Sequence, residues 1–392
     1  MSQKLVSLNQ DLSRLRSEGY DVSIKADHLV IKDVPFVNSQ REIKRGILVS
    51  VLDIAGGKTL MPETHVIFFV GDYPCDTKGA PLPGVSQNTN QQILPEFLPN
   101  HQVSRKRTIG RYQDYYEKMT TLIEIVMSPA LAIDPTVTAK THPVVVPDEG
   151  DSVFNYIDTA ATKAGIVLAN QKLESGKIAI VGVGGTGSYV FDLIAKTPVE
   201  EIHLFDGDHF YNHNAFRSPG APSNDELGQK LKKVAYFQQL YSKMRKGIVA
   251  HDAFLDESNI DQLRNMGFVF LCIDRGAAKP LIVEKLEEWG IPFIDVGMGI
   301  QLGEDNSLGG ILTVTSSTPE KRDHFRTRVA LSDGEAQNEY SNNIQIADLS
   351  ALNATLAVIK WKKLRGYYQD YMREHFCAYS INANQLDSKD MA

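Results

Sequence analysis

The chain has 392 residues, of which 42% are hydrophobic and 23% are charged, and its formal net charge is −7. These values are typical of a globular protein with room for two ordinary cores, and they exclude a disordered or fibrous chain. The acidic balance gives no global electrostatic reason to expect nucleic acid or an anionic membrane as a partner.

Membrane insertion and secretion are not expected either. No apolar run approaches the roughly 20 residues that cross a bilayer, and residues 1–20 lack the apolar core of a signal peptide. The cysteines Cys75, Cys272 and Cys377 are widely spaced and form no CxxC pair, zinc knuckle or disulfide framework. We therefore expect a cytoplasmic protein.

The first part of the chain, residues 1–147, is expected to be a smaller α+β domain that ends where proline, glycine and acids cluster. Amphipathic and alternating patterns predict its elements. These are a helix at 4–20, strands at 20–34, 43–54 and 63–74, a loop at 79–110, a helix at 111–127 and a strand at 141–148. The basic run at 104–111 is interpreted as a solvated loop.

The second part, residues 148–392, alternates strands and helices, which predicts a doubly wound, mainly parallel Rossmann-like α/β domain. Strands are expected at 177–183, 201–206, 247–254, 268–274 and 292–298, and helices at 186–196, 225–245, 258–265 and 276–289. Two antiparallel strands at 299–304 and 308–316, a charged segment at 319–340 and a long helix at 346–371 follow. That last helix is expected either in the core or at a dimer interface.

A glycine-rich turn joins the first strand of this domain to its first helix. Gly182, Gly184, Gly185 and Gly187 spell GxGGxG within "VGVGGTGS". Such a turn lets backbone N–H groups approach the phosphates of a nucleotide at a helix N-terminus. The alternative is a turn that merely packs the helix on the strand.

Residues beyond the second strand distinguish between nucleotides. Asp206 lies 24 residues after Gly182, where an acid binds the ribose of any adenine nucleotide. Asn214 and Arg217 follow 8 and 11 residues later, before the lysine-rich "GQKLKKVAYFQQL". Cationic groups favour a triphosphate that loses pyrophosphate over neutral hydride transfer, because charge builds on the leaving group.

Four ordered segments, "VGVGGTGS", "DGDHFYNHNAFR", the lysine helix and "FLCIDRGAAK", resemble the adenylation domain of the ThiF/MoeB and ubiquitin-activating-enzyme superfamily. The resemblance covers roughly residues 150–375. The chain also resembles bacterial ThiF-like proteins that carry an extra uncharacterised N-terminal domain and are often associated with ubiquitin-like conjugation operons.

The resemblance implies a role for each matching residue. Asp274 is implied to hold Mg²⁺ against the phosphates. Its alternative or additional role is to cap the N-terminus of a helix that begins at Gly276 and Ala277. Lys230 and Lys233 both remain candidates for the phosphate-binding lysine, and they are expected to share one helix face. The implied catalytic set is Arg217, Asp274, Lys233 and Lys230; the implied nucleotide-binding set is Gly182, Gly184, Gly185, Gly187, Asp206, Asp208 and Asn214.

The implied activity is ATP- and Mg²⁺-dependent adenylation of the C-terminal glycine of a ubiquitin-like protein, in a homodimer. The antiparallel strands near 299–315 would carry this partner, with Gly297 and Gly299 close to its tail. An NAD(P)-dependent oxidoreductase and a non-catalytic ATP-binding scaffold are the alternatives.

The acceptor of the activated acyl group is left open. Many relatives use a cysteine after the fifth strand, but no cysteine lies between Cys272, expected to be buried, and Cys377. A separate conjugating protein, a hydroxyl of Ser316, Ser317 or Thr318 with His324 as base, or an exposed Cys75 are the candidates. The first domain is expected to recruit a partner or to be a degenerate conjugating-enzyme-like fold.

Overall fold

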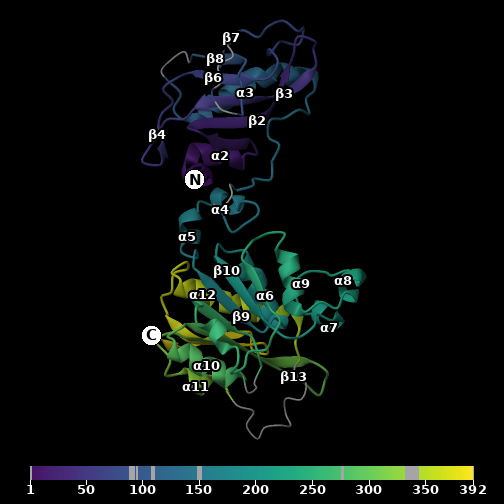
Figure 1. Cartoon of the computed structure of the whole chain (residues 1–392), viewed down its shortest axis with the longest axis vertical. Helices are drawn as coiled ribbons and strands as arrows, with labels where there is room; N and C mark the ends of the chain where they lie inside the picture. Colours follow the sequence, from purple (N-terminus) through teal and green to yellow (C-terminus); the bar gives the residue numbers. More distant parts are fainter. Residues whose placement is uncertain are drawn as a thin grey trace. The chain divides into compact units, whose positions relative to one another are not determined.

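The computed structural model describes residues 2–87, 93, 96–106, 111–147, 152–274, 278–331 and 344–391 (Figure 1). The chain divides into two compact units. Unit 1 comprises Met1–Asp151 and Tyr156–Val167, and unit 2 comprises Ser152–Asn155 and Leu168–Ala392. The assignment of separate domains to 1–147 and 148–392 stays a prediction.

Unit 1 is an antiparallel sheet covered by helices. Its elements are α1 (Ser2–Leu8), α2 (Gln10–Ser17), β1 (Asp21–Lys25), β2 (His28–Val37), β3 (Ile43–Val51), β4 (Ile54–Ala55), β5 (Lys58–Thr59), β6 (Val66–Val70), β7 (Val85–Gln87), β8 (His101–Ser104), α3 (Tyr115–Ile133) and α4 (Thr159–Lys163). The order in its main sheet is β1-β2-β3-β6-β8-β7. The apolar sides of α2 and α3 pack on one face of this sheet and form the core of the unit.

Several expectations for unit 1 are corrected. The helix expected at 4–20 is two helices, because Asn9 adopts an extended backbone and its side chain donates to the carbonyls of Leu5 and Gly57. The loop expected at 79–110 contains β7 and β8. Residues 141–147 form no strand, and α3 continues to Ile133.

Unit 2 is the larger unit. It contains β9 (Lys177–Val181), α6 (Gly185–Ala195), β10 (Glu201–Phe205), α7 (Asn212–Ala215), α8 (Asn224–Gly228), α9 (Lys233–Tyr241), β11 (Ile248–His251), η1 (Ile260–Leu263), β12 (Phe268–Leu271), α10 (Ala278–Glu288), β13 (Phe293–Leu302), β14 (Leu308–Ser317), α11 (Phe325–Arg328), α12 (Ala347–Leu364), β15 (Glu374–Ser380) and β16 (Gln385–Met391). The short helix α5 (Val167–Gln171) begins at the boundary between the units.

The sheet of unit 2 has the order β11-β10-β9-β12-β13-β14-β15-β16. Strands β11, β10, β9, β12 and β13 are parallel, whereas β13, β14, β15 and β16 pair antiparallel. Helices α6, α9 and α12 pack on one face, and η1, α10 and α11 pack on the other. The predicted doubly wound, Rossmann-like fold, preceded by a smaller α+β domain, is confirmed.

This topology determines where a ligand is expected. The chain leaves β9 toward β10 and β11 and then crosses to β12 on the opposite side of β9. A crevice opens at such a switch point, beyond the carboxyl ends of the strands. The glycine turn follows β9, so it lies at this edge.

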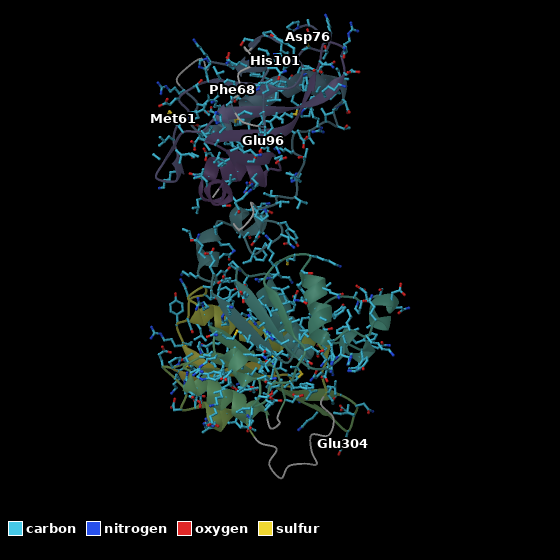
Figure 2. The ribbon with its side chains drawn as sticks, viewed as in Figure 1. Met61, Phe68, Asp76, Glu96, His101 and Glu304 are labelled. Atoms are coloured by element: carbon cyan, nitrogen blue, oxygen red, sulfur yellow. The ribbon has the colours of Figure 1, made fainter. Side chains whose placement is uncertain are left out.

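The boundaries of unit 2 also differ from expectation in places. The helix expected at 225–245 is split into α8 and α9, because Lys230 has a φ of +49° and Lys232 is extended. The strands expected at 292–298 and 299–304 form the single strand β13. Glu304 lies in the turn between β13 and β14 (Figure 2).

The C-terminal part of unit 2 was only partly anticipated. Helix α12 ends at Leu364, and the strands β15 and β16 were not predicted. Among the described residues, none of the helices combines the length and apolar character required for a membrane span.

Candidate functional site

The glycine turn is built by close backbone contacts. Gly182 has a φ of +85°, and a Cβ there would lie 2.6 Å from the carbonyl oxygen of Cys272. A Cβ at Gly187 would lie 1.9 Å from the carbonyl oxygen of Gly182. These two glycines therefore allow α6 to pack tightly on the ends of β9 and β12.

The other two glycines serve different purposes. A Cβ at Gly185 would lie 2.7 Å from the Ser350 hydroxyl, so the absence of a side chain at Gly185 allows the start of α6 to lie close to α12. Gly184 is the N-cap of α6, and a Cβ there would meet nothing within 4 Å. Open space beside the N-terminus of an 11-residue helix suits a negatively charged group.

Asp206, at the carboxyl end of β10, supports this turn directly. Its side chain is 6% exposed, and Oδ2 accepts a hydrogen bond of 2.8 Å from the backbone N–H of Val183 inside the turn. Oδ1 accepts a bond of 2.9 Å from the N–H of Asp208. Asp206 thus joins the turn after β9 to the segment after β10.

The lysine that reaches this carboxylate is Lys233. Its buried Nζ lies 2.7 Å from Asp208 Oδ2 and 3.4 Å from Asp206 Oδ2. Lys233 is the first residue of α9, and its backbone N–H donates to the carbonyl of Asp208. Asp208 remains largely accessible, since 58% of its side chain is exposed.

Lys230 does not share a helix face with Lys233, which corrects the expectation. It lies before α9 with a left-handed backbone and is exposed. Lys232 donates a hydrogen bond of 2.7 Å to the carbonyl of Gly207 and pairs with Asp252. Lys233 is therefore the lysine that lies against the Asp206 carboxylate.

Asn214 and Arg217 lie around the short helix α7. Asn214 is 3% exposed, and its Oδ1 accepts a bond of 2.9 Å from the backbone N–H of Tyr211. The carbonyl oxygen of Arg217 would lie 3.5 Å from a Cβ at Gly185, which places its backbone beside the start of α6. Within the described parts of the chain, the buried Nε of Arg217 has no hydrogen-bond partner.

Asp274 follows β12 at the same edge. Its side chain is exposed; burial raises the pKa of Asp295 on neighbouring β13, and the charge of Asp274 adds to this effect. The side chain of Ile273 and the carbonyl of Cys272, the two preceding residues, face Gly182. The expected N-cap partners Gly276 and Ala277 lie outside the described residues, and α10 begins at Ala278.

A buried ion pair behind Asp274 was missed by the sequence analysis. Lys279 Nζ, at the start of α10, lies 2.5 Å from Asp295 Oδ1, with only 6% and 5% of the two side chains exposed. Burial raises the pKa of Asp295 to about 6, against the attraction of Lys279. The only sequence signal was a pair of charged residues inside otherwise apolar segments.

Polar side chains of α12 were missed as well. Ser350 and Asn353 are fully buried, and Asn353 donates a hydrogen bond of 2.9 Å to the carbonyl of Gly297 on β13. Ser350 Oγ, Asn353 Oδ1 and Gln345 Oε1 lack hydrogen-bond partners among the residues that the structure describes.

None of the cysteines combines an exposed position with a lowered pKa. Cys75, considered above as an exposed candidate, is only 1% exposed, and its thiol donates to the carbonyl of Tyr73. Burial and the charge of Asp76 raise its pKa. Burial also raises the pKa of Cys272 and lifts that of Cys377, on β15, to about 11, so neither forms a thiolate readily.

The hydroxyl candidates are not in a loop. Ser316 and Ser317 are fully buried at the end of β14, and Thr318 is 6% exposed. Nε2 of His324 lies 3.0 Å from the carbonyl oxygen of Ser316, not from a hydroxyl. Their burial shields these groups from a bulky acyl donor.

Comparison with known proteins identifies two families along the chain. Residues 158–378 match the ThiF family, and residues 10–159 match DUF6791, a domain of unknown function. No curated protein matches the chain.

Three solved structures that resemble this chain each share 18% sequence identity with it. Escherichia coli (E. coli) MccB with ATP is 18% identical, with a TM-score of 0.46, covering 60% of this chain and 70% of that chain. The microcin C7 biosynthetic enzyme MccB with N-formylated MccA is 18% identical, with a TM-score of 0.47 and the same coverage. PaaA is 18% identical, with a TM-score of 0.42, covering 57% of this chain and 76% of that chain. The match to the ThiF family, over residues 158–378, covers more than half of the chain, so the chain belongs to the ThiF family.

Proposed function

We propose that this chain is an adenylyltransferase that uses ATP to activate the C-terminal glycine of a ubiquitin-like protein. The observation that supports it best is the convergence of three segments on the glycine turn. Asp206 binds the turn through Val183, the Arg217 backbone lies beside Gly185, and the residues before Asp274 contact Gly182.

The proposed reaction is attack by the glycine carboxylate on the α-phosphorus of ATP. A bond forms between the carboxylate oxygen and the α-phosphorus, which gives an acyl-adenylate. The bond from the α-phosphorus to the oxygen that bridges to the β-phosphate breaks, and pyrophosphate leaves with its electron pair. No side-chain nucleophile is required, so positioning and charge compensation would supply most of the acceleration. Arg217 and Lys233 would hold the phosphates, and Asp206 or Asp208 the ribose.

Magnesium fits this arrangement as an ion shared with the nucleotide. Asp274 presents an exposed carboxylate at the carboxyl edge of the sheet. No group of three or more His, Cys, Asp or Glu side chains in the described part of the chain is placed to hold a metal. One carboxylate with phosphate and water oxygens is the usual coordination of Mg²⁺ in such sites. Bound there, the ion would neutralise charge on the departing pyrophosphate.

The tail of the modifier is proposed to run along β13. Gly299 has open space at its Cβ position, whereas a Cβ at Gly297 would lie 2.4 Å from the Thr313 hydroxyl. Gly299→Leu is therefore the appropriate variant to obstruct the tail, because Gly297 substitutions would also disturb folding.

Transfer of the acyl group is proposed to involve a separate conjugating protein. The burial of Cys75, Ser316 and Ser317 argues against a covalent intermediate on this chain. Because Cys377 lies in the sheet with a raised pKa, it is equally unsuited. A homodimer remains part of the proposal; α12, however, buries its Ala354, Ala357 and Trp361 side chains within the core of unit 2.

ATP–pyrophosphate exchange tests the proposal. The full chain is incubated with candidate ubiquitin-like proteins, Mg²⁺, ATP and labelled pyrophosphate, and with the same modifiers lacking their terminal glycine. Exchange is expected only with the intact tail, and to fall at least about 100-fold in Asp274→Ala. Asp261→Ala, at an exposed aspartate of η1, is the matched control. Exchange that ignores the glycine, or a change in NAD(P)H absorbance instead of exchange, would overturn the proposal.

A further inference from the structure

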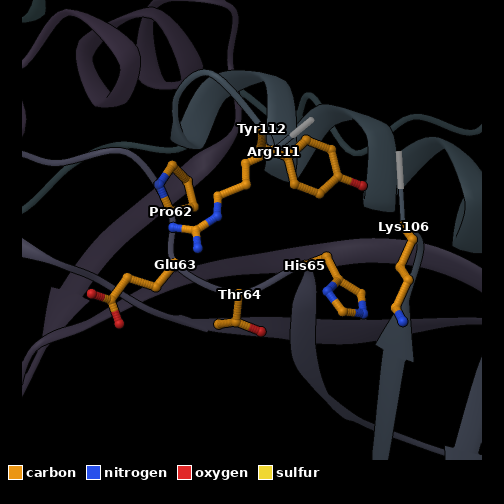
Figure 3. Close-up of a pocket in the computed structure, with 7 residues that line it drawn as sticks. All are labelled: Pro62, Glu63, Thr64, His65, Lys106, Arg111 and Tyr112. Carbon is orange, nitrogen blue, oxygen red and sulfur yellow. The ribbon is translucent and has the colours of Figure 1, made fainter. Parts of the chain in front are cut away.

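Unit 1 contains a cavity that the proposed adenylation does not use. Its volume is about 220 Å³, and it lies at the end of the sheet where β6 begins and β8 ends (Figure 3). The residues that line it are Pro62, Glu63, Thr64, His65, Lys106, Arg111 and Tyr112.

Basic side chains reach this cavity from three segments. His65 precedes β6, Lys106 follows β8, and Arg111 lies just before α3. Figure 3 shows Lys106 beside His65 and the guanidinium of Arg111 near Glu63. The antiparallel pairing of Val66 with Ser104 explains why the first two lie together. With Glu63 as the acidic lining residue, the cavity carries an excess of positive charge even when His65 is neutral.

The walls are held by contacts inside the unit. Tyr112 is 3% exposed, and its hydroxyl donates a bond of 2.9 Å to the carbonyl of Arg105. Thr64 Oγ1 accepts the backbone N–H of Val66 at 3.0 Å, which leaves its hydroxyl proton available as a donor. Glu63 is fixed through its backbone N–H, which donates to Asp53. The cavity is therefore framed by ordered contacts of unit 1, and the exposed side chains of Lys106 and Arg111 agree with the solvated basic run expected from the sequence.

We propose that this cavity binds a phosphomonoester. The cavity lining offers four kinds of donor, namely an ammonium, a guanidinium, an imidazole N–H and a hydroxyl. These are more donors than a planar carboxylate uses, and they suit the three terminal oxygens of a phosphate. A volume of about 220 Å³ leaves room for the phosphate and a few further atoms. The ligand is either a small phosphorylated metabolite or a phosphorylated side chain of a partner protein; both present the same group.

The test uses the full chain and the imidazole NMR signal of His65, assigned by its loss in His65→Asn. O-phosphoserine, glycerol 3-phosphate and a phosphoserine peptide are titrated separately, with serine and the unphosphorylated peptide as controls. A saturable shift of the His65 signal is expected with at least one phosphorylated probe. Lys106→Gln is expected to raise the dissociation constant by about tenfold or more, because one charge-assisted hydrogen bond is lost.

A variant in unit 2 separates this site from the nucleotide site. Arg217→Ala is expected to leave the His65 titration unchanged while it weakens ATP binding. Saturation by small phosphates supports a metabolite, and saturation by the phosphopeptide alone supports a partner protein. A titration without saturation, or one that is unaffected by both Lys106→Gln and Arg111→Gln, would refute the site. Lys389→Gln, an exposed lysine in β16, controls for a general change in charge.

Discussion

The carboxylate of Asp206 accepts a hydrogen bond of 2.8 Å from the backbone N–H of Val183, the residue between the first two glycines of the turn. This bond ties the segment that follows β10 to the segment that follows β9. Asp206, which the sequence predicts as a ribose ligand, therefore also supports the glycine turn structurally.

We predict different effects for the two aspartates near this turn. Asp206→Ala leaves the N–H groups of Val183 and Asp208 without their acceptor and is expected to cost on the order of 2 kcal/mol of stability. Asp208→Ala removes an exposed side chain and is expected to cost under about 1 kcal/mol. Urea unfolding followed by tryptophan fluorescence reports on unit 2, where Trp289 and Trp361 both lie. Equal losses would contradict the proposed support.

Alanine substitutions at two glycines of the turn, Gly187 and Gly184, are predicted to affect folding and ATP binding separately. Gly187→Ala is expected to prevent correct packing of α6, because its Cβ would lie 1.9 Å from the carbonyl oxygen of Gly182. Gly184→Ala meets open space with a φ of −78° and is expected to fold with a stability within about 0.5 kcal/mol of wild type. Its methyl group would occupy the approach to the helix N-terminus, so ATP affinity should fall. Calorimetric titration with ATP checks this; unchanged affinity would remove Gly184 from the nucleotide site.

Lys279 is predicted to stabilise unit 2 in a pH-dependent way. Lys279→Met leaves the Asp295 carboxylate buried without its partner, which costs about 3–5 kcal/mol near pH 7.5. Burial already raises the pKa of Asp295 to about 6 in the folded protein. Because the folded state binds this proton more tightly than the unfolded state, the free energy of unfolding decreases as pH rises from about 4 through 6. Without Lys279 the pKa rises further, and the loss should shrink at pH 5. Lys279→Arg should retain most of the stability; a loss independent of pH would contradict the argument.

Lys118 is predicted to make unit 1 more stable at alkaline pH. Its side chain is fully buried in α3, with Nζ 2.9 Å from the Ser50 hydroxyl, and burial lowers its pKa to about 8. Because the folded pKa is depressed, the stability from this group is lost as pH falls from 10.5 through 8. Relative to Lys118→Met, the wild type should gain on the order of 3 kcal/mol between pH 8 and 10.5. Urea unfolding by circular dichroism, with fluorescence marking unit 2, measures the difference.

The three cysteines are predicted to be dispensable for adenylation. Cys75→Ala, Cys272→Ala and Cys377→Ala combined should retain modifier-dependent exchange, because no thiol has a lowered pKa or an exposed position. Native wild type should also react slowly with iodoacetamide, as judged by mass spectrometry. Formation of a thiol-sensitive adduct that disappears in the combined variant would show that one cysteine accepts the acyl group.

The alternating pattern of unit 2 was sufficient to predict its parallel sheet and the glycine turn after the first strand. Local spacing carries this information, since an apolar strand, a glycine turn and an amphipathic helix are each written in consecutive residues. Proximity of Asp206 to the turn also followed, because carboxyl ends of neighbouring parallel strands share one edge. The same reasoning failed at Lys230, where a left-handed residue between α8 and α9 breaks a lysine-rich run that looks helical.

The tertiary structure decided what no local pattern encodes. Asn353 reaches Gly297 and Ser350 reaches Gly185 only because α12 packs back onto α6 and β13. Lys279 and Asp295 pair because α10 returns beside β13, and Cys75 is buried by the packing of unit 1. Burial and long-range contacts depend on how distant segments pack, and this packing sets which charged and nucleophilic groups water and substrates reach. The sequence by itself therefore determined the fold class and the edge of the sheet at which the glycine turn lies, while packing decided which of the candidate groups there are paired, buried or open.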